Sequence, residues 1–304
     1  MRIVFMGSPD FAIPSLEKLN NSAHEIVSVV SNIDKRRGRG SKSSPTAVKK
    51  KALEFDLPVI EVEDLNDPQF HDQLKSLNAD LFVVVAFRIL PSSILSLPAK
   101  GSVNLHASLL PKYRGAAPIH WAIMEGESET GCSIFFLDEN VDTGNIIRQQ
   151  KTPIGKNETT GDLYKRLKKM GGELLLNAIE DIDKGLVDTF PQDDDKATPA
   201  PKLFTEDCKV DFQRSAQEVH NKIRGLSPFP TAWAKLDDMK FNLYRSQLGP
   251  QKKLAPGRLQ MHQDNLLVGC NLGTVILDEV QLQGKQRMSG KDFMNGYNGR
   301  GMLH

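Results

Sequence analysis

The chain has 304 residues, 39% of them apolar, with 39 basic and 38 acidic side chains. This length and balance are typical of one large or two ordinary folded domains and exclude wholesale disorder. No run approaches the roughly 18 apolar residues of a membrane helix, no signal peptide is visible, and the three cysteines lack disulfide or zinc spacing. We therefore expect a cytoplasmic protein that neither contacts a membrane nor binds a metal.

The first two thirds of the sequence alternate between short apolar runs and amphipathic segments. Strands are predicted at residues 2–6, 25–30, 58–62, 80–87, 103–106 and 131–137. Helices are predicted between them, capped at Ser8-Pro9, Ser44-Pro45 and Asp67-Pro68, with a long last helix from a Thr159/Asp162 capping box to about residue 184. This order is typical of a Rossmann-like, mostly parallel sheet with helices on both faces, whose ligands bind beyond the carboxyl ends of the strands.

The pattern changes after residue 188. Residues 189–206 are rich in aspartate and proline without apolar periodicity, which indicates a linker. A capped helix from Ser215 to Gly225 and short strands follow it, and the strands are predicted at 232–236, 241–248, 257–261, 266–270 and 274–283. Short strands at close spacing predict a small OB-like β-barrel. We therefore expect a first domain at 1–188, a linker at 189–206 and a C-terminal domain at 207–304.

Charge is balanced overall but not along the chain. Residues 207–304 contain 14 basic and 9 acidic residues, a net charge of +5, whereas residues 1–206 carry −4. A second basic region between Asp34 and Lys51 holds eight basic residues and one acidic residue. Charge runs are most often solvated surface, but two separate basic regions favour a polyanionic partner.

Candidate catalytic residues concentrate in the segment NLHASLLPKYRGAAPIHWAI at 104–123 and in the DTG turn at 142–144. Asn104 and His106 alternate on a predicted strand, so their side chains share one face near its carboxyl end. Asparagine offers an N–H to a developing oxyanion, histidine relays a proton, and Asp142 can orient the imidazole. This trio fits attack of an amine on a carbonyl carbon. The neighbouring hydroxyl, that of Ser108, shows no sign of an activated nucleophile.

The string HASLLPKYRGAAPIHWAI resembles the signature of the formyltetrahydrofolate-dependent formyltransferases, and the chain is most similar to the methionyl-tRNA formyltransferase family. The likeness extends through MGSPDF near the N-terminus, the Gly38-Arg39-Gly40 loop, ETG at 129–131, the DTG turn and SPFPTAW at 227–233. It implies transfer of a formyl group from 10-formyltetrahydrofolate to the methionine amine of initiator methionyl-tRNA. The matching catalytic residues are Asn104, His106 and Asp142, and we expect a monomer.

The resemblance also implies two folate-binding stretches and a nucleic-acid surface. The residues expected to bind folate are Phe87, Arg88, Ile89 and Leu90 in one stretch and Ser108, Leu109, Leu110 and Pro111 in the other. Many members carry a glycine after the aromatic residue of the first stretch, which this chain lacks, and core packing is the alternative for the leucines and isoleucine. The residues expected to bind tRNA are Arg36, Arg37, Arg39, Lys42 and Arg224. Arg39 would probe the end of the acceptor helix, and the basic C-terminal domain would supply salt-sensitive phosphate contacts.

Other functions stay open at this point. A small-molecule amine formyltransferase, acting on a purine precursor or a nucleotide amino sugar, or a formyltetrahydrofolate hydrolase would share the trio without needing the basic loop or the barrel. A nicotinamide-dependent oxidoreductase suits the α/β order, but the first turn, MGSPD at 6–10, lacks G-x-G-x-x-G. An RNA-binding protein without catalysis would leave the trio unexplained.

Overall fold

The computed structural model describes residues 1–36, 43–297 and 301–304, which form two compact units. Unit 1 comprises Met1–Gly115, Gly131–Thr152 and Lys165–Pro199, and unit 2 comprises Ala116–Thr130, Pro153–Tyr164 and Ala200–His304. Two segments from the first two thirds of the chain thus group with the C-terminal part. The division into domains at 1–188 and 207–304 stays a prediction about which parts fold independently.

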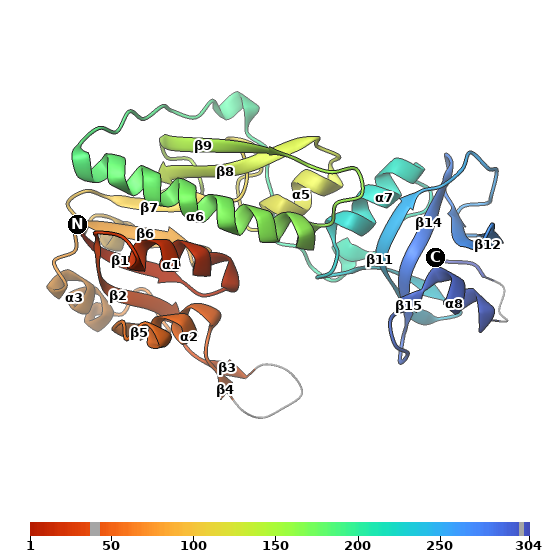
Figure 1. The fold of residues 1–304 in the computed structure, drawn as a ribbon, viewed down its shortest axis with the longest axis horizontal. Coiled ribbons are helices and arrows are strands. Elements are labelled where there is room, and N and C mark those ends of the chain that lie inside the picture. The colour runs from red at the N-terminus through yellow and green to blue at the C-terminus, as the bar shows by residue number, and fades with distance from the viewer. Residues whose placement is uncertain (37–42, 298–300) are drawn as a thin grey trace. The chain divides into compact units, whose positions relative to one another are not determined.

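Unit 1 is built on a seven-stranded sheet in the order β5-β2-β1-β6-β7-β8-β9 (Figure 1). Its strands are β1 (Arg2–Gly7), β2 (Glu25–Asn32), β5 (Val59–Val62), β6 (Leu81–Val85), β7 (Ser102–His106), β8 (Glu129–Phe136) and β9 (Ile146–Pro153). The pairs from β5 to β7 are parallel, and β8 runs antiparallel to β7. The strand order reverses between β1 and β6, as in Rossmann-type sheets. The predicted mostly parallel sheet is confirmed.

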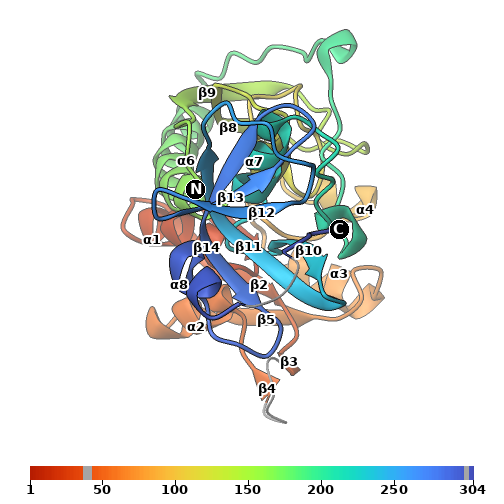
Figure 2. The same cartoon turned by 90° about the vertical axis from the view of Figure 1, so that its right-hand side faces the viewer.

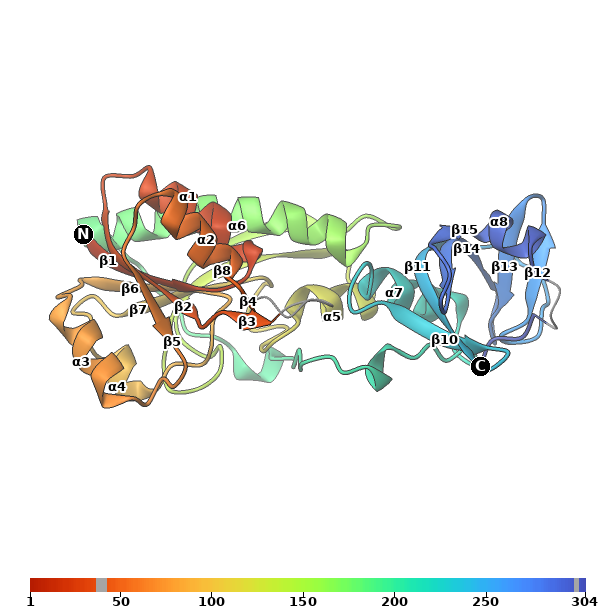
Figure 3. The same ribbon diagram turned by 90° about the horizontal axis from the view of Figure 1, so that it is seen from below.

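Helices cover both faces of this sheet (Figure 3). On one face lie α1 (Ile13–Asn20), α2 (Ala47–Glu54) and α6 (Thr160–Lys184), and on the other lie α3 (Pro68–Ser76) and α4 (Ser92–Leu95). Helix α6 approaches the sheet closely at Gly171, where a Cβ would come within 2.8 Å of the Leu105 side chain. Among the described residues, no helix is both long and apolar enough to cross a bilayer.

The helix starts confirm some predicted caps and correct others. The predicted cap at Ser8 is wrong, because a 3-10 turn at Asp10–Ala12 precedes α1 and Ser8 Oγ instead accepts from Asn32 Nδ2 at 2.9 Å. Helix α2 is capped by Thr46, not Ser44. The predicted caps at Asp67, Thr159 and Ser215 are confirmed. Local sequence therefore predicts that a helix follows more reliably than which hydroxyl begins it.

The described part of unit 2 combines α-helices with an antiparallel sheet in the order β10-β11-β14-β13-β12 (Figure 2), and β15 pairs with β14. Its elements are α5 (Pro118–Met124), α7 (Ala216–Gly225), β10 (Ala232–Leu236), β11 (Met239–Leu248), β12 (Leu259–His262), β13 (Asn265–Gly269), β14 (Thr274–Leu282), β15 (Met288–Ser289) and α8 (Gly290–Asn295). Near the C-terminus, Leu303 bridges to Leu236 of β10 and Met302 to Arg258 beside β12, so these residues connect both sheet edges. The predicted β-rich C-terminal domain is confirmed.

A buried histidine in unit 2 is expected to make its stability depend on pH. His220 Nε2 lies 3.0 Å from the Lys156 carbonyl oxygen, to which it donates, and Nδ1 lies 2.9 Å from Ser246 Oγ, which can donate to it. The neutral ring thus satisfies both partners. Burial lowers the pKa of His220 below its ordinary value of 6.5, and nearby Arg224 lowers it further. Because the unfolded chain then binds a proton more readily than the folded one, stability is lost as the pH falls below 6.5.

We expect the free energy of unfolding, measured by urea denaturation, to fall between about pH 7 and about pH 5.5. His220→Gln should flatten this pH dependence, whereas His262→Gln, at a more exposed position, should leave it as in the wild type. Burial also lowers the pKa values of His24 and His120, so both should contribute to the slope that remains. If His220→Gln kept the wild-type pH dependence of the free energy of unfolding, protonation of His220 would not be coupled to unfolding.

Candidate active site

His106 is the last residue of β7 and lies at the carboxyl edge of the parallel strands. Its ring is buried, with 6% of the residue exposed. Nε2 lies 2.8 Å from the Tyr113 carbonyl oxygen, which only accepts, so Nε2 carries a proton and donates it. Nδ1 faces the Asp142 carboxylate, with 3.6 Å between Nδ1 and Oδ2. The structure therefore brings His106 and Asp142 together, and a proton on Nδ1 would face a negative charge.

Asp142 lies in the turn that connects β8 and β9. Its backbone has a φ of +57°, in the left-handed region, and its Oδ2 accepts the Gly115 N–H at 2.8 Å. The turn needs glycine at position 144, because a Cβ there would lie 1.7 Å from the Phe136 carbonyl oxygen. The DTG sequence thus places a buried carboxylate beside the imidazole through a backbone that most residues would not adopt.

Asn104 precedes His106 by two residues on β7, so the two side chains share one face of the strand. Its Oδ1 is buried and accepts no hydrogen bond from any residue that the structure describes. Buried amide groups in native proteins are nearly always hydrogen-bonded. Asn104 Oδ1 therefore has unused acceptor capacity of the kind that a water or the N–H of a bound amine would fill.

The stretch that follows β7 is held by hydrogen bonds between its main-chain groups and polar side chains. Ser108 is fully buried and its Oγ donates to the Lys112 carbonyl oxygen at 2.6 Å, so it is not poised as a nucleophile. The Leu110 N–H donates to Ser133 Oγ at 3.0 Å, and the Leu110 carbonyl accepts from Gln149 Nε2 at 2.9 Å. The Leu110 side chain belongs to the core, as the alternative interpretation of this stretch expected.

The stretch from Phe87 to Leu90 mixes core and surface. Leu90 packs in the core of unit 1 with Phe87 against it, whereas Ile89 is 73% exposed. The Arg88 guanidinium donates to the carbonyl oxygens of Val62 and Glu63, at 2.8 and 2.7 Å, and partial burial lowers the pKa of Arg88. Arg88 thus anchors the stretch to the end of β5, which leaves Ile89 as its most accessible apolar side chain.

A thiol is not an alternative nucleophile at this site. Cys132 lies on β8 beside Ser133 and is fully buried. Burial raises the pKa of the Cys132 thiol to about 12. Since the thiolate and not the thiol is the reactive form, Cys132 stays inert near neutral pH.

The residues predicted to bind tRNA meet different outcomes. Arg37, Arg39 and Lys42 lie outside the described residues, and Arg36 contributes its main chain to β3 (Lys35–Arg36), which pairs with β4 (Ser43–Ser44). Arg224 requires a correction. It is 4% exposed, and its guanidinium donates to Asn221 Oδ1 and to the carbonyl oxygens of residues 155 and 158. A buried guanidinium whose donors are used inside the protein is structural. Arg224 is therefore not available to contact a phosphate.

Several polar residues that support the site escape sequence interpretation. Ser133, Gln149, Gln192 and Thr198 all hydrogen-bond to main-chain groups of the loops around His106 and Asp142. Ser133 lies in the strand predicted at 131–137, but nothing local marks this role, and Gln192 and Thr198 come from the segment predicted to be a linker. Their common signal is spatial, because each satisfies main-chain groups of a loop.

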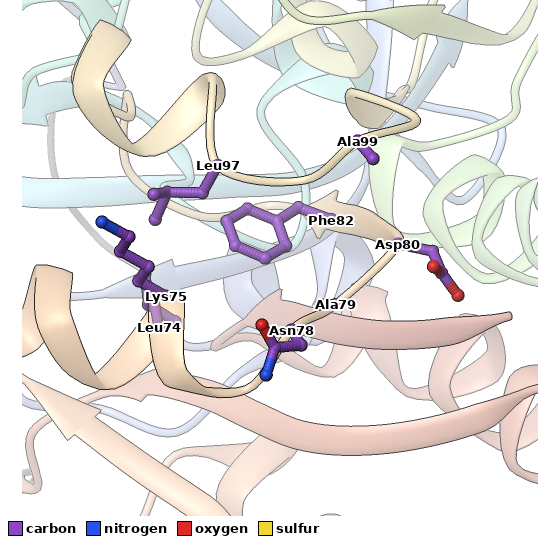
Figure 4. Close-up of a pocket in the computed structure, with 8 residues that line it drawn as sticks. All are labelled: Leu74, Lys75, Asn78, Ala79, Asp80, Phe82, Leu97 and Ala99. Atoms are coloured by element: carbon purple, nitrogen blue, oxygen red, sulfur yellow. The ribbon is translucent and has the colours of Figure 1, made fainter.

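A cavity of about 350 Å³ lies elsewhere in unit 1 (Figure 4). Its walls include Leu74, Lys75, Phe82 and Leu97, and Asp80 stands at its rim just before β6 begins. The cavity is thus at the amino end of the strands, opposite the edge that carries His106. The Asp80 carboxylate is already used, since Oδ2 accepts the Arg2 N–H at 2.7 Å. This cavity contains none of the residues of the candidate active site.

The fold is a mostly parallel α/β sheet with an imidazole and a carboxylate together at the carboxyl edge of its parallel strands and an amide two residues before the imidazole. A family model described as formyl transferase matches residues 1–179, and one described as the formyl transferase C-terminal domain matches residues 202–298. The chain therefore belongs to the formyl transferase family, as its sequence motifs predict.

The similarity to individual relatives extends over nearly the whole chain. It is 43% identical to the methionyl-tRNA formyltransferase of Chlorobium luteolum over 304 residues, covering 98% of this chain and 97% of that protein. It is 40% identical to the methionyl-tRNA formyltransferase of Porphyromonas gingivalis over 309 residues, covering 98% and 96%. Among solved structures, an N-formyltransferase from Helicobacter canadensis in complex with folinic acid and dTDP-3-aminofucose is similar in fold, with a TM-score of 0.68 at 22% identity, covering 90% of this chain and 98% of that one.

Proposed function

We propose that this chain transfers the formyl group of 10-formyltetrahydrofolate to the amine of methionine esterified to initiator tRNA, which yields N-formylmethionyl-tRNA and tetrahydrofolate. The observation that carries the proposal is identity of 40% or more to methionyl-tRNA formyltransferases along both units, not the catalytic part alone. The structural neighbour solved in complex with dTDP-3-aminofucose is only 22% identical. We place the activity in the cytoplasm and assign it to a monomer.

The residues present fit a formyl donor. When bound, 10-formyltetrahydrofolate supplies a carbonyl carbon that an amine can attack. Asn104 shares a face of β7 with His106, and its Nδ2 group can donate to the formyl oxygen as negative charge develops there, while its unpartnered Oδ1 can accept from the attacking amine. We assign the folate-binding surface to the stretches 87–90 and 108–111, with Ile89 as the exposed apolar contact.

His106 and Asp142 manage the proton that the attacking amine must lose. Nε2 of His106 is committed to the Tyr113 carbonyl, so Nδ1 is the ring nitrogen left to accept the proton of the amine. That proton then passes to the folate nitrogen as its bond to the formyl carbon breaks. Asp142 fixes the ring and stabilises its protonated form. Only the neutral amine is a nucleophile, so kcat/KM should rise with pH through the pKa of the methionyl amine.

The direct test incubates the full chain with 10-formyltetrahydrofolate and methionyl initiator tRNA and measures formylmethionine that resists acid deacylation. We expect formation of formylmethionyl-tRNA that depends on the folate donor. The same assay with a nucleotide amino sugar or a purine precursor in place of tRNA should give no formylated product. Formylation of a small amine but not of methionyl-tRNA would assign the chain to the alternative class, and release of formate without an acceptor would assign it to the hydrolases.

Charge reversal in the basic loop should separate tRNA use from folate use. Arg39 matches the arginine that, by resemblance, probes the end of the acceptor helix, although it lies outside the described residues. We expect Arg39→Glu to lower kcat/KM for methionyl-tRNA by roughly 10–100-fold, the effect of one or two lost charge-assisted contacts, with an unchanged KM for the folate donor. Lys100→Glu makes the same charge change at an exposed site of unit 1 and should leave both values unchanged. Equal losses for both substrates in Arg39→Glu would remove the loop from tRNA recognition.

A further inference from the structure

The segment predicted to be a linker returns to the catalytic loops of unit 1. After α6, the chain passes alongside β9 (Figure 1), and the main chains of Phe190 and Ile146 exchange two hydrogen bonds of 2.9 and 3.1 Å. A few residues later, Thr198 accepts the Tyr113 N–H on its Oγ1 and the Arg114 N–H on its carbonyl oxygen, both at 2.9 Å. Residues 190–199 are therefore hydrogen-bonded to the loops around the candidate site and do not form a linker that lacks contacts with unit 1.

Gln192 is the residue of this segment that touches the turn of Asp142. Its Nε2 donates to the carbonyl oxygens of Asp142 and Gly144, both at 2.9 Å. Its Oε1 accepts from Nε and Nη2 of Arg114, at 3.1 and 2.8 Å. A primary amide has two N–H donors and two acceptor lone pairs, and here all four are used.

These four bonds join the two loops that hold the imidazole and the carboxylate. Arg114 lies between Tyr113, whose carbonyl accepts from His106, and Gly115, whose N–H donates to Asp142. Tyr113 and Asp142 both have left-handed backbones, with φ of +63° and +57°, which persist only where their surroundings hold them. The Gln192 amide helps to stabilise both backbones, because it hydrogen-bonds to the Arg114 side chain next to Tyr113 and to the Asp142 carbonyl.

We propose that Gln192 is a positioning residue, which keeps the Asp142 carboxylate facing His106 by tying the Asp142 turn to the loop of Arg114. The inference rests on the proposed roles of His106 and Asp142. It does not make Gln192 a catalytic residue, since its side chain is fully engaged with the protein. A glutamate at this position would keep the bonds from Arg114 but would set a carboxylate oxygen against two carbonyl oxygens, so the turn would have to move.

The test compares Gln192→Glu with the wild type in the formylation assay. We expect kcat to fall roughly 10–100-fold, as displacements of about 1 Å can produce, while the KM values for both substrates change less than about twofold. Gln213→Glu makes the same substitution at an exposed position of unit 2 and should leave kcat unchanged. If Gln192→Glu does not fold, Gln192→Met, which also removes both donors without adding charge, takes its place.

A double-mutant cycle with Asp142→Asn separates positioning from general destabilisation. If Gln192 acts through Asp142, Gln192→Glu should lower kcat by less than about threefold in the Asp142→Asn background. A wild-type kcat in Gln192→Glu, or a full further loss in the double variant, would overturn the inference while the trio stands. A wild-type kcat in Asp142→Asn would instead overturn the proposed trio and, with it, this inference.

Discussion

Replacing His106 or Asp142 with alanine is expected to lower kcat by roughly 10²–10⁴-fold. His106 is buried between the Tyr113 carbonyl and the Asp142 carboxylate, so its removal eliminates the group that exchanges the proton of the amine. Removal of Asp142 leaves the imidazole without the charge that stabilises its protonated form. The measurement is the rate of formylmethionyl-tRNA formation at saturating folate donor and tRNA.

The control for these variants is His71→Ala, since His71 lies on α3, away from the candidate site. Circular dichroism and thermal unfolding should show that each variant is folded. A folded His106→Ala or Asp142→Ala with near-normal kcat would remove that residue from the mechanism.

Asn104→Ala is expected to lower kcat by about 10²–10³-fold, the loss seen when one donor to an oxyanion is removed. The Nδ2 group of Asn104 is the donor proposed for the formyl oxygen, and its buried Oδ1 accepts no hydrogen bond from the described residues. Asn104→Asp should be at least as damaging, because an ionised carboxylate has no donor and repels a developing negative charge. Truncation of an exposed asparagine, Asn66→Ala, should leave kcat unchanged. If Asn104→Ala raised KM for the folate donor with kcat intact, the amide would serve binding and not the chemical step.

Most strands of unit 1 are predictable because continuous apolar runs bounded by turn residues produce them. The predicted runs at 2–6 and 103–106 correspond to β1 (Arg2–Gly7) and β7 (Ser102–His106). No range is predicted for β9, because only its first two residues are apolar and buried and its middle is exposed at the sheet edge. The single turn α4 (Ser92–Leu95) is also missed, since four residues are too few to show helical periodicity.

The candidate site is predictable where local geometry decides and not where the fold brings distant residues together. Strand alternation places Asn104 and His106 on one face without further information. Pairing of His106 with Asp142 follows from the resemblance, because no local rule connects positions on different strands. Gln192 has no such signal, since aspartate- and proline-rich surroundings are typical of a linker and its role depends on two main-chain carbonyls in another loop. Arg224 illustrates the opposite error. Its basic surroundings in the sequence predict a phosphate contact, but its guanidinium is buried and donates to other groups of the protein.

The central claim is that the amide of Asn104, the imidazole of His106 and the carboxylate of Asp142 surround one transferable formyl group. A crystal structure of the chain bound to a folate that carries a non-transferable formyl group tests it most directly. We expect the formyl oxygen about 2.7–3.1 Å from the side-chain amide of Asn104, with the formyl carbon on the same side of β7 as His106. A formyl group bound at the opposite edge of the sheet, beside the cavity of Phe82 and Leu97, would contradict the account.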